Sequence, residues 1–512
     1  MTSNVQGCLT SEFENRRPLL CRIHLPRSHL HRRGMAGTGF VGRGTELGAL
    51  AKRLERVRSS GNGAAVTIRG RRQVGKSRLV QEFCDLARVP YFFFTATKGM
   101  SPVESVDAFC SELRESLLPS EPESVPQASM GSWPDAFRIL SSALPTAPSI
   151  VVVDELPWLA EQDELFDGAL QTAWDRLLAT KPVLLLLLGS DLHMMERFTA
   201  YDRPFFGRAD AMVLGPLNPA ETADALGLTG GDAIDAYLTC GGLPGILRVW
   251  PTGTPALDFI RQECADPASP VFNVPESALL AEFPTPDQAR RVLEAVGSGD
   301  RTQANIAATA GGRQGALSSG SLSPLLRRLS EEKRVLAIDE PLSTRPGKPA
   351  LYRVADHNLR LYLGVFRAAA DRSRRGQPEA AIRLVERRWC SLRGRAVEPV
   401  VREALTMAAV AGHLPWSDVE TVGGWWNRRF DPEVDLVGAD RAPIARRIGF
   451  AGSIKWLGAA FDHHDFARLR EAAAQVPGHD SGGLVAVSLS GVTPGLDLDL
   501  AWGPDDVIAA WR

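Results

Sequence analysis

The clearest chemical signal in this chain is a loop of eight residues. It reads Gly70-Arg71-Arg72-Gln73-Val74-Gly75-Lys76-Ser77 and matches the pattern G-x-x-x-x-G-K-S. The loop follows the apolar run 64–68 and opens a predicted helix, so its N–H groups and the helix N-terminus can surround an anion. Lys76 is expected to reach the β- and γ-phosphates of ATP, and the Ser77 hydroxyl to ligate Mg²⁺. A tight glycine turn is the alternative, which the full match disfavours.

A pair of carboxylates further along the chain fits the same chemistry. The β-branched run 149–153 ends in Asp154 and Glu155, as expected of a buried parallel strand. Open α/β sheets bind ligands at the carboxyl ends of such strands. Asp154 would hold the Mg²⁺ shell, and Glu155 would act as the general base that polarises the attacking water. The residues expected to bind nucleotide directly are Gly70, Arg71, Arg72, Gln73, Val74, Gly75, Lys76, Ser77 and Arg78.

Two further polar residues are catalytic candidates. The apolar run 183–188 ends in Gly189-Ser190, which places Ser190 to sense the γ-phosphate. Arg208 could stabilise charge on the transferring phosphoryl group, in cis or from a neighbouring subunit. The alternative for Arg208 is an ordinary surface arginine in a loop. Gly241-Gly242-Leu243-Pro244 predicts a break between helices over the nucleotide.

Composition indicates a multidomain cytoplasmic protein. At 512 residues, three to four domains can each bury a core. The formal net charge of -2 gives no whole-chain electrostatic argument for nucleic acid. Seven cysteines without a C-x-x-C motif indicate reduced thiols rather than a disulfide framework. No apolar stretch approaches the roughly 18–20 residues of a membrane helix, so no membrane segment is expected.

The N-terminal segment differs from the rest of the chain. It is rich in arginine, has no clear periodicity and lacks the apolar core of a secretory signal. A nucleic-acid-binding arm is one interpretation, and a disordered tail is the interpretation we favour. A start at Met35 would give a conventional beginning, and residues 1–35 are expected to be unstructured.

Residues 285–356 have the pattern of a winged helix-turn-helix. Helices are predicted from Asp287 to Val296, closed by Gly297, then over 303–309 with Thr302 as its cap, and over 317–329. Two strands at 334–338 and 350–354 follow, joined by a basic loop. Basic residues outnumber acidic ones, and the third helix of such a module can enter a major groove of DNA. Winged helices also bind proteins, so both partners stay open.

The last part of the chain suggests a second site. After a helical connector with a basic stretch at 372–375, a helix is predicted to begin at Gly394 and to carry Glu398. Strands at 431–437 and 447–456 carry Asp435 and Lys455. Helix glutamate, strand aspartate and strand lysine are the layout of a PD-(D/E)xK nuclease-like core, in which carboxylates hold Mg²⁺ and the lysine orients water.

One position departs from that layout. Two residues before Lys455, a carboxylate is expected, and the chain has Ser453. A hydroxyl is a poor replacement for a charged ligand of a hard cation. Glu398, Asp435 and Glu433 would be left to hold a metal. The sequence therefore favours a degraded, binding or structural domain over an active nuclease, with ordinary surface charges as a further alternative.

The chain from about residue 36 onward resembles the prokaryotic archaeal-type ATPases of the AAA+/STAND group of P-loop proteins. That resemblance implies ATP binding and hydrolysis, a helical lid, a winged helix and a restriction-endonuclease-like C-terminal domain of unknown function. The matching residues are Phe40-Val41-Gly42-Arg43 with Glu46-Leu47, the 70–77 loop, Asp154-Glu155, Gly189-Ser190, Phe206-Gly207-Arg208, Gly241-Gly242-Leu243-Pro244, Gly423-Gly424-Trp425-Trp426 and Ile454-Lys455-Trp456.

The expected fold is α/β, with an AAA+-like parallel sheet followed by the modules above. The main hypothesis is an ATP-driven protein that acts on DNA. The alternative is a STAND-type signalling ATPase that recruits a protein partner, and oligomerisation fits both. A metabolic kinase is disfavoured because no acceptor-substrate motif is present. The expected parts are a tail (1–35), an ATPase core (36–215), a lid (216–284), a winged helix (285–356), a helical connector (357–389) and a nuclease-like domain (390–512).

Overall fold

The computed structural model describes residues 40–118, 131–283, 287–347, 349–480 and 482–512. The chain divides into one unit that ends at Val41 and a second unit from Gly42 to Arg512. The predicted disordered tail lies outside the described residues. None of the helices in these ranges has the length and apolar character that crossing a membrane requires.

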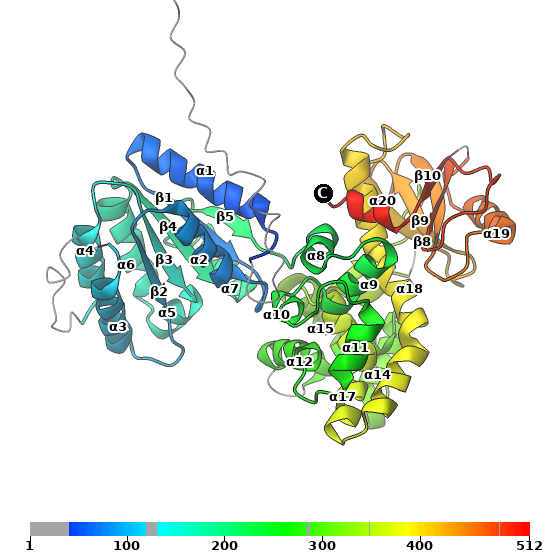
Figure 1. The fold of residues 1–512 in the computed structure, drawn as a ribbon, viewed down its shortest axis with the longest axis horizontal. Helices are drawn as coiled ribbons and strands as arrows, with labels where there is room; N and C mark the ends of the chain where they lie inside the picture. Colours follow the sequence, from blue (N-terminus) through cyan, green and yellow to red (C-terminus); the bar gives the residue numbers. More distant parts are fainter. Residues whose placement is uncertain (1–39, 119–130, 284–286, 348, 481) are drawn as a thin grey trace, which may run out of the picture. The chain divides into compact units, whose positions relative to one another are not determined.

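The first part of the second unit is built on a parallel sheet (Figure 1). In the described residues this sheet has five strands in the order β2-β3-β4-β1-β5. Strands β3 and β4 are buried along their whole length, which explains their continuous apolar sequences and confirms both predicted strands. The strands are β1 (Ala64–Arg69), β2 (Tyr91–Thr95), β3 (Ser149–Asp154), β4 (Val183–Gly189) and β5 (Asp210–Val213).

Helices cover this sheet and complete its core. On one side, an aromatic cluster joins β2 to α3 and α4, with Phe109 making edge contacts to Phe92 and Trp133 at centroid distances of 4.9 and 5.5 Å. The helices are α1 (Gly44–Ser60), α2 (Lys76–Ala87), α3 (Pro102–Glu115), α4 (Trp133–Ala143), α5 (Leu156–Gln162), α6 (Phe166–Ala173), the π-helical turn Trp174–Leu178 and α7 (Leu192–Phe198).

A run of helices follows the sheet. It contains α8 (Pro219–Leu226), α9 (Gly230–Cys240), α10 (Pro244–Leu247), α11 (Ala256–Cys264) and α12 (Pro270–Glu282). The predicted break at Gly241 and Gly242 is confirmed. Both glycines have positive φ, and a Cβ on Gly242 would lie 2.0 Å from the Leu217 carbonyl oxygen. Only glycine permits this close turn between α9 and α10.

Residues 287–354, here called the helix–hairpin segment, contain short helices followed by two antiparallel strands. Thr302 caps its helix as predicted, because its side chain accepts from the Asn305 N–H. The predicted helix end at Gly297 is wrong: the helix continues to Ser298, and Gly297 is buried against Leu363. The elements are α13 (Gln288–Ser298), α14 (Gln303–Gly311), the 3₁₀ turn Gly312–Gln314, α15 (Ser319–Arg327), the π-helical turn Arg328–Glu332, β6 (Leu336–Asp339) and β7 (Leu351–Val354).

Long helical structure connects this segment to the end of the chain. It consists of α16 (His357–Leu361), the π-helical turn Tyr362–Phe366, α17 (Arg367–Arg374) and α18 (Pro378–Val410). The predicted helix start at Gly394 is wrong, because α18 begins 16 positions earlier at Pro378 and passes through Gly394. Burial of Trp389 and Val397 on either side of Gly394 outweighs the roughly 1 kcal/mol that a glycine costs in a helix. The basic stretch is helical too, and Arg374 pairs with Glu276.

The remaining residues, here called the C-terminal sheet, form a mixed sheet ordered β12-β11-β10-β9-β8. Strands β8, β9 and β10 pair antiparallel, whereas β10, β11 and β12 pair parallel. Helix α19 makes the crossover between β10 and β11 that parallel pairing requires. The elements are β8 (Thr421–Trp426), β9 (Glu433–Ala439), β10 (Ile448–Lys455), α19 (His463–Ala473), β11 (Gly483–Ser488), β12 (Leu500–Trp502) and α20 (Pro504–Ala509).

The loop between β6 and β7 docks on the C-terminal sheet. Leu342 is 1% exposed and packs in one apolar cluster with Trp425 and Val434. Backbone N–H groups of the loop also donate to carbonyl oxygens of the C-terminal residues. These pairs are Leu342 to Gly424 (2.8 Å), Ser343 to Pro443 (3.4 Å) and Thr344 to Pro477 (3.1 Å). The described part of this loop is therefore bound within the chain.

Substitution of Gly438 by alanine should destabilise the C-terminal sheet. A Cβ at Gly438 would lie 2.2 Å from the ring of Phe450, which is fully buried on the neighbouring strand. We expect a loss of about 1–3 kcal/mol in the free energy of unfolding, measured by urea denaturation with tryptophan fluorescence. Gly458→Ala is the matched control, because nothing lies within 4 Å of its Cβ position. Equal midpoints for the two variants would contradict the packing argument.

Candidate functional site

The predicted phosphate-binding loop joins the end of β1 to the first turn of α2. Gln73 and Gly75 have positive φ angles of 67° and 91°, which curl the backbone before the helix begins at Lys76. Gly70 allows a close backbone approach, because a Cβ there would lie 2.3 Å from the Leu214 carbonyl oxygen. A curled loop followed directly by a helix N-terminus presents N–H groups to an anion.

Lys76 is folded back onto this loop. Its Nζ donates to the carbonyl oxygens of Gly70 and Arg71 at 2.8 and 3.0 Å. Burial lowers the pKa of Lys76, while the carboxylates of Glu155 and Asp154 oppose this effect by favouring the ammonium form. Phosphate oxygens bound in the loop would be stronger acceptors for this ammonium group than the carbonyls.

Ser77 and Asp154 meet although they are 77 residues apart. The Ser77 hydroxyl donates to Asp154 Oδ2 at 2.5 Å, and the Glu155 N–H donates to Asp154 Oδ1 at 2.8 Å. Burial raises the pKa of Asp154, and these hydrogen bonds oppose the shift. A hydroxyl and a carboxylate are the oxygen ligands that a nucleotide-bound Mg²⁺ takes from a protein, so this pair fits the predicted ion.

Glu155 and Ser190 form the next pair along the same edge of the sheet. The Ser190 hydroxyl donates to Glu155 Oε2 at 2.9 Å, and Glu155 has a positive φ of 54° just before α5. Ser77, Glu155 and Ser190 border a cavity of about 360 Å³, whose lining also includes Gln73, Gly75 and Lys76. This volume lies in the range of small-molecule sites, which is about 300–1,000 Å³.

Arg43 supports the loop in a way that its sequence motif did not reveal. Its guanidinium donates to the carbonyl oxygens of Val74 and Gly215 at 2.9 and 2.6 Å, and the side chain is almost fully buried. Glu221 accepts from the Arg43 N–H at 2.6 Å. The only sequence signal was the position of Arg43 directly after Gly42, which says nothing about these distant partners.

Arg208 lies outside this set of contacts. Its guanidinium makes a bidentate pair with the Asp175 carboxylate, with both N···O distances at 2.8 Å, and it is not among the residues that line the cavity. It also donates to the carbonyl oxygens of Pro204 and Phe206. This geometry gives no support to a role for Arg208 within its own nucleotide site.

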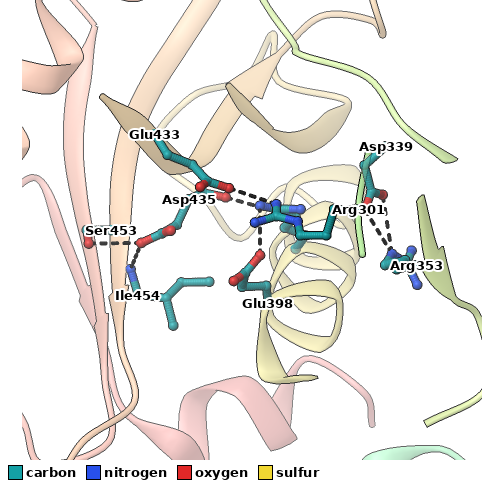
Figure 2. A network of polar contacts seen from close by, with 9 residues as sticks. Arg301, Asp339, Arg353, Glu398, Glu433, Asp435, Ser453 and Ile454 are labelled. Carbon is teal, nitrogen blue, oxygen red and sulfur yellow. Dashed lines mark hydrogen bonds and ion pairs between the residues drawn. The ribbon is translucent and has the colours of Figure 1, made fainter. Parts of the chain in front are cut away.

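At the predicted second site, Glu398 of α18 lies close to Asp435 of β9 (Figure 2). Burial raises the pKa of both carboxyls, and the charge of Asp435 raises that of Glu398 further. Ser453 replaces the expected carboxylate, and its hydroxyl donates to Asp435 Oδ2 at 3.0 Å. The Ile454 N–H donates to the same oxygen at 2.8 Å. Asp435 is therefore already hydrogen-bonded within its own sheet.

Cationic side chains complete this second site in a way that does not fit a nuclease metal. Arg402 donates to Glu398 Oε2 at 3.4 Å and to the backbone carbonyl oxygen of Asp435 at 2.8 Å. Lys455 does not join the carboxylate pair, because its Nζ is bound to Asp465 of α19. Among the residues that the structure describes, no group of three or more His, Cys, Asp or Glu is arranged to hold a metal ion.

The nucleotide site lies in a part of the chain that matches a known domain. Residues 39–187 match the model of the AAA ATPase domain, so the match includes the 70–77 loop, Asp154 and Glu155 and ends before Ser190. The chain thus carries an AAA ATPase domain, a class of domain that binds nucleotide. A search of the curated proteins found no match.

Weak similarities to solved structures extend over a longer part of the chain. A Walker-type ATPase of Pyrococcus abyssi is 19% identical, with 63% of this chain and 96% of that chain covered and a TM-score of 0.43. The ORC2 protein of Aeropyrum pernix is 13% identical over 68% and 98%, with a TM-score of 0.41. The ORC1 protein of the same organism, in complex with DNA, is 15% identical over 68% and 94%, with a TM-score of 0.34. These TM-scores are too low to establish a shared overall fold.

Glu155→Gln should separate nucleotide binding from hydrolysis. The amide oxygen can still accept from Ser190, and the Ser77–Asp154 pair is untouched, but the predicted general base is lost. We expect ATP affinity to be retained and turnover to fall by about 10²–10⁴-fold, measured by phosphate release and by equilibrium nucleotide binding. Lys76→Ala, which should lose binding as well, is the comparison. Wild-type turnover in the Gln variant would show that Glu155 is not the base.

Proposed function

We propose that this protein binds and hydrolyses ATP in the cavity beside the 70–77 loop. The observation that carries the proposal is the pairing of Ser77 with Asp154 and of Ser190 with Glu155 at one edge of the sheet. In this proposal Lys76 and the loop N–H groups hold the phosphates, and Ser77 and Asp154 hold Mg²⁺. Glu155 activates water, and Ser190 orients the Glu155 carboxylate.

We further propose that ATP turnover is coupled to DNA, with the helix–hairpin segment acting as a winged helix. Its order of α13, α14 and α15 followed by the β6–β7 hairpin supports this assignment. Helix α15 and the turn after it expose Ser319, Ser321, Ser323, Arg327 and Arg328. Helix α15 carries no acidic residue, although Glu331 and Glu332 follow Arg328 in the turn after it.

The order and pairing of the elements in the C-terminal sheet support the proposal that this part is a nuclease-like domain that does not cleave DNA. Helix α18, antiparallel strands β8 to β10, crossover helix α19 and parallel strand β11 follow one another in the order of a PD-(D/E)xK core. The helix glutamate and strand aspartate are in place, but Ser453 and Arg402 take the positions around Asp435. We assign this domain a binding role.

DNA should stimulate ATP hydrolysis by the full chain, and the exposed arginines at the end of α15 and the start of the next turn should be needed for this. For Arg327→Ala/Arg328→Ala we expect weaker binding of labelled duplex DNA in fluorescence anisotropy. A plot of the logarithm of the DNA association constant against the logarithm of the salt concentration should become less steep by about 2, one unit for each lost phosphate contact. Arg58→Ala, an exposed arginine at the end of α1, is the matched control. An unchanged slope and unchanged stimulation would exclude α15 as the DNA contact.

One observation favours a second candidate function, a signalling ATPase of the STAND type with a protein partner. The hairpin loop, which in a DNA-binding winged helix is available to the duplex, is bound to the C-terminal sheet through Leu342 to Thr344. A protein of this kind would hydrolyse ATP slowly, retain nucleotide tightly and change its oligomeric state with nucleotide. Turnover that ignores DNA would therefore favour this second function.

Arg208 is proposed to act on the nucleotide of a neighbouring copy, since it pairs with Asp175 outside its own cavity. Arg208→Ala should keep ATP affinity and lose turnover. A mixture of Arg208→Ala with Lys76→Ala should then regain part of the activity, because one partner supplies the arginine and the other the intact loop. Turnover at the wild-type rate in Arg208→Ala alone would identify a surface arginine instead.

A further inference from the structure

An arginine of the helix–hairpin segment, Arg301, reaches a carboxylate of the C-terminal sheet (Figure 2). Arg301, between α13 and α14, places Nη2 at 2.8 Å from Glu433 Oε1, with both side chains about one-third exposed (31% and 32%). The positive charges of Arg402, Arg301 and Arg360 all favour the ionised form of Glu398. Burial lowers the pKa of Arg360 to about 10, and the charge of Glu398 opposes this shift.

We propose that the nuclease-like carboxylate site is an internal latch, in which arginines replace the metal ion and hold the helix–hairpin segment on the C-terminal sheet. The cations are Arg301 and Arg402, and the anions are Glu398, Glu433 and Asp435. This inference goes beyond the proposed function and rests on neither ATP hydrolysis nor DNA binding.

The latch follows from the cost of burying charge. Glu398 and Asp435 are partly buried, and desolvation raises the pKa of both, so cationic neighbours that favour the ionised carboxylates stabilise this site. Arg402 already donates to Glu398 and to the Asp435 backbone, so a divalent cation would have to displace it. Arg301 extends this neutralisation to Glu433 from another segment. The docked loop at Leu342 lies between the same two parts of the chain.

Charge reversal tests the latch directly. In Arg301→Glu, the backbone amides of Leu342, Ser343 and Thr344 should exchange with solvent at least about threefold faster, because the loop opens more often. The double variant Arg301→Glu/Glu433→Arg should return exchange to near the wild-type rate. Arg290→Glu is the matched control, since Arg290 pairs with Glu294 within α13. Wild-type exchange in Arg301→Glu, or no rescue in the double variant, would overturn the latch.

Metal binding provides the second test. Mn²⁺ is titrated into the nucleotide-free full chain, and free Mn²⁺ is followed by its paramagnetic resonance signal. The latch predicts identical titrations for the wild type and Asp435→Asn, because arginines already occupy the site. Loss of a bound Mn²⁺ in Asp435→Asn would show that the carboxylates hold a metal and would overturn the proposal. Both tests use protein without ATP or DNA, so their outcome is independent of the proposed function.

Discussion

The parallel pairing of β1 and β3 with β4 is the constraint on which the nucleotide site depends. Arg69 lies opposite Gly189 and Val153 opposite Leu187, so β1, β3 and β4 end at one edge of the sheet. The 70–77 loop, the Asp154-Glu155 pair and Ser190 therefore emerge side by side, although they are far apart in sequence. The apolar sequences that place β3 and β4 inside the sheet thus also fix the positions of the polar residues that follow these strands.

Both candidate sites contain carboxylates that are buried or partly buried, but the two sites satisfy them in different ways. At the nucleotide site, neutral hydroxyls of Ser77 and Ser190 donate to Asp154 and Glu155. A hydroxyl leaves the negative charge in place, so a cation beside a bound phosphate is still attracted. In the C-terminal sheet, guanidinium groups such as Arg402 bring the positive charge themselves. The first arrangement is suited to exchangeable ligands and the second to a permanent structural contact.

The docked hairpin loop changes how the helix–hairpin segment can meet a partner. Leu342 of this loop is buried in the apolar cluster of the C-terminal sheet. The serines and arginines at α15, by contrast, are exposed to solvent. The loop hydrogen bonds and the Arg301–Glu433 pair link this segment to the C-terminal sheet. A ligand bound at α15 would therefore bind to a segment that already contacts the C-terminal sheet.

The sequence by itself determined the loop between β1 and α2, strands β1, β3 and β4 and the Thr302 cap. These features follow from short-range signals, namely glycine spacing, apolar runs and a capping side chain. Only the tertiary structure decided that Arg43 supports the loop, that α18 passes through Gly394 and that Lys455 pairs with Asp465. Each of these depends on packing or charge contacts between residues whose proximity is created by the fold, and local patterns carry no information about such contacts.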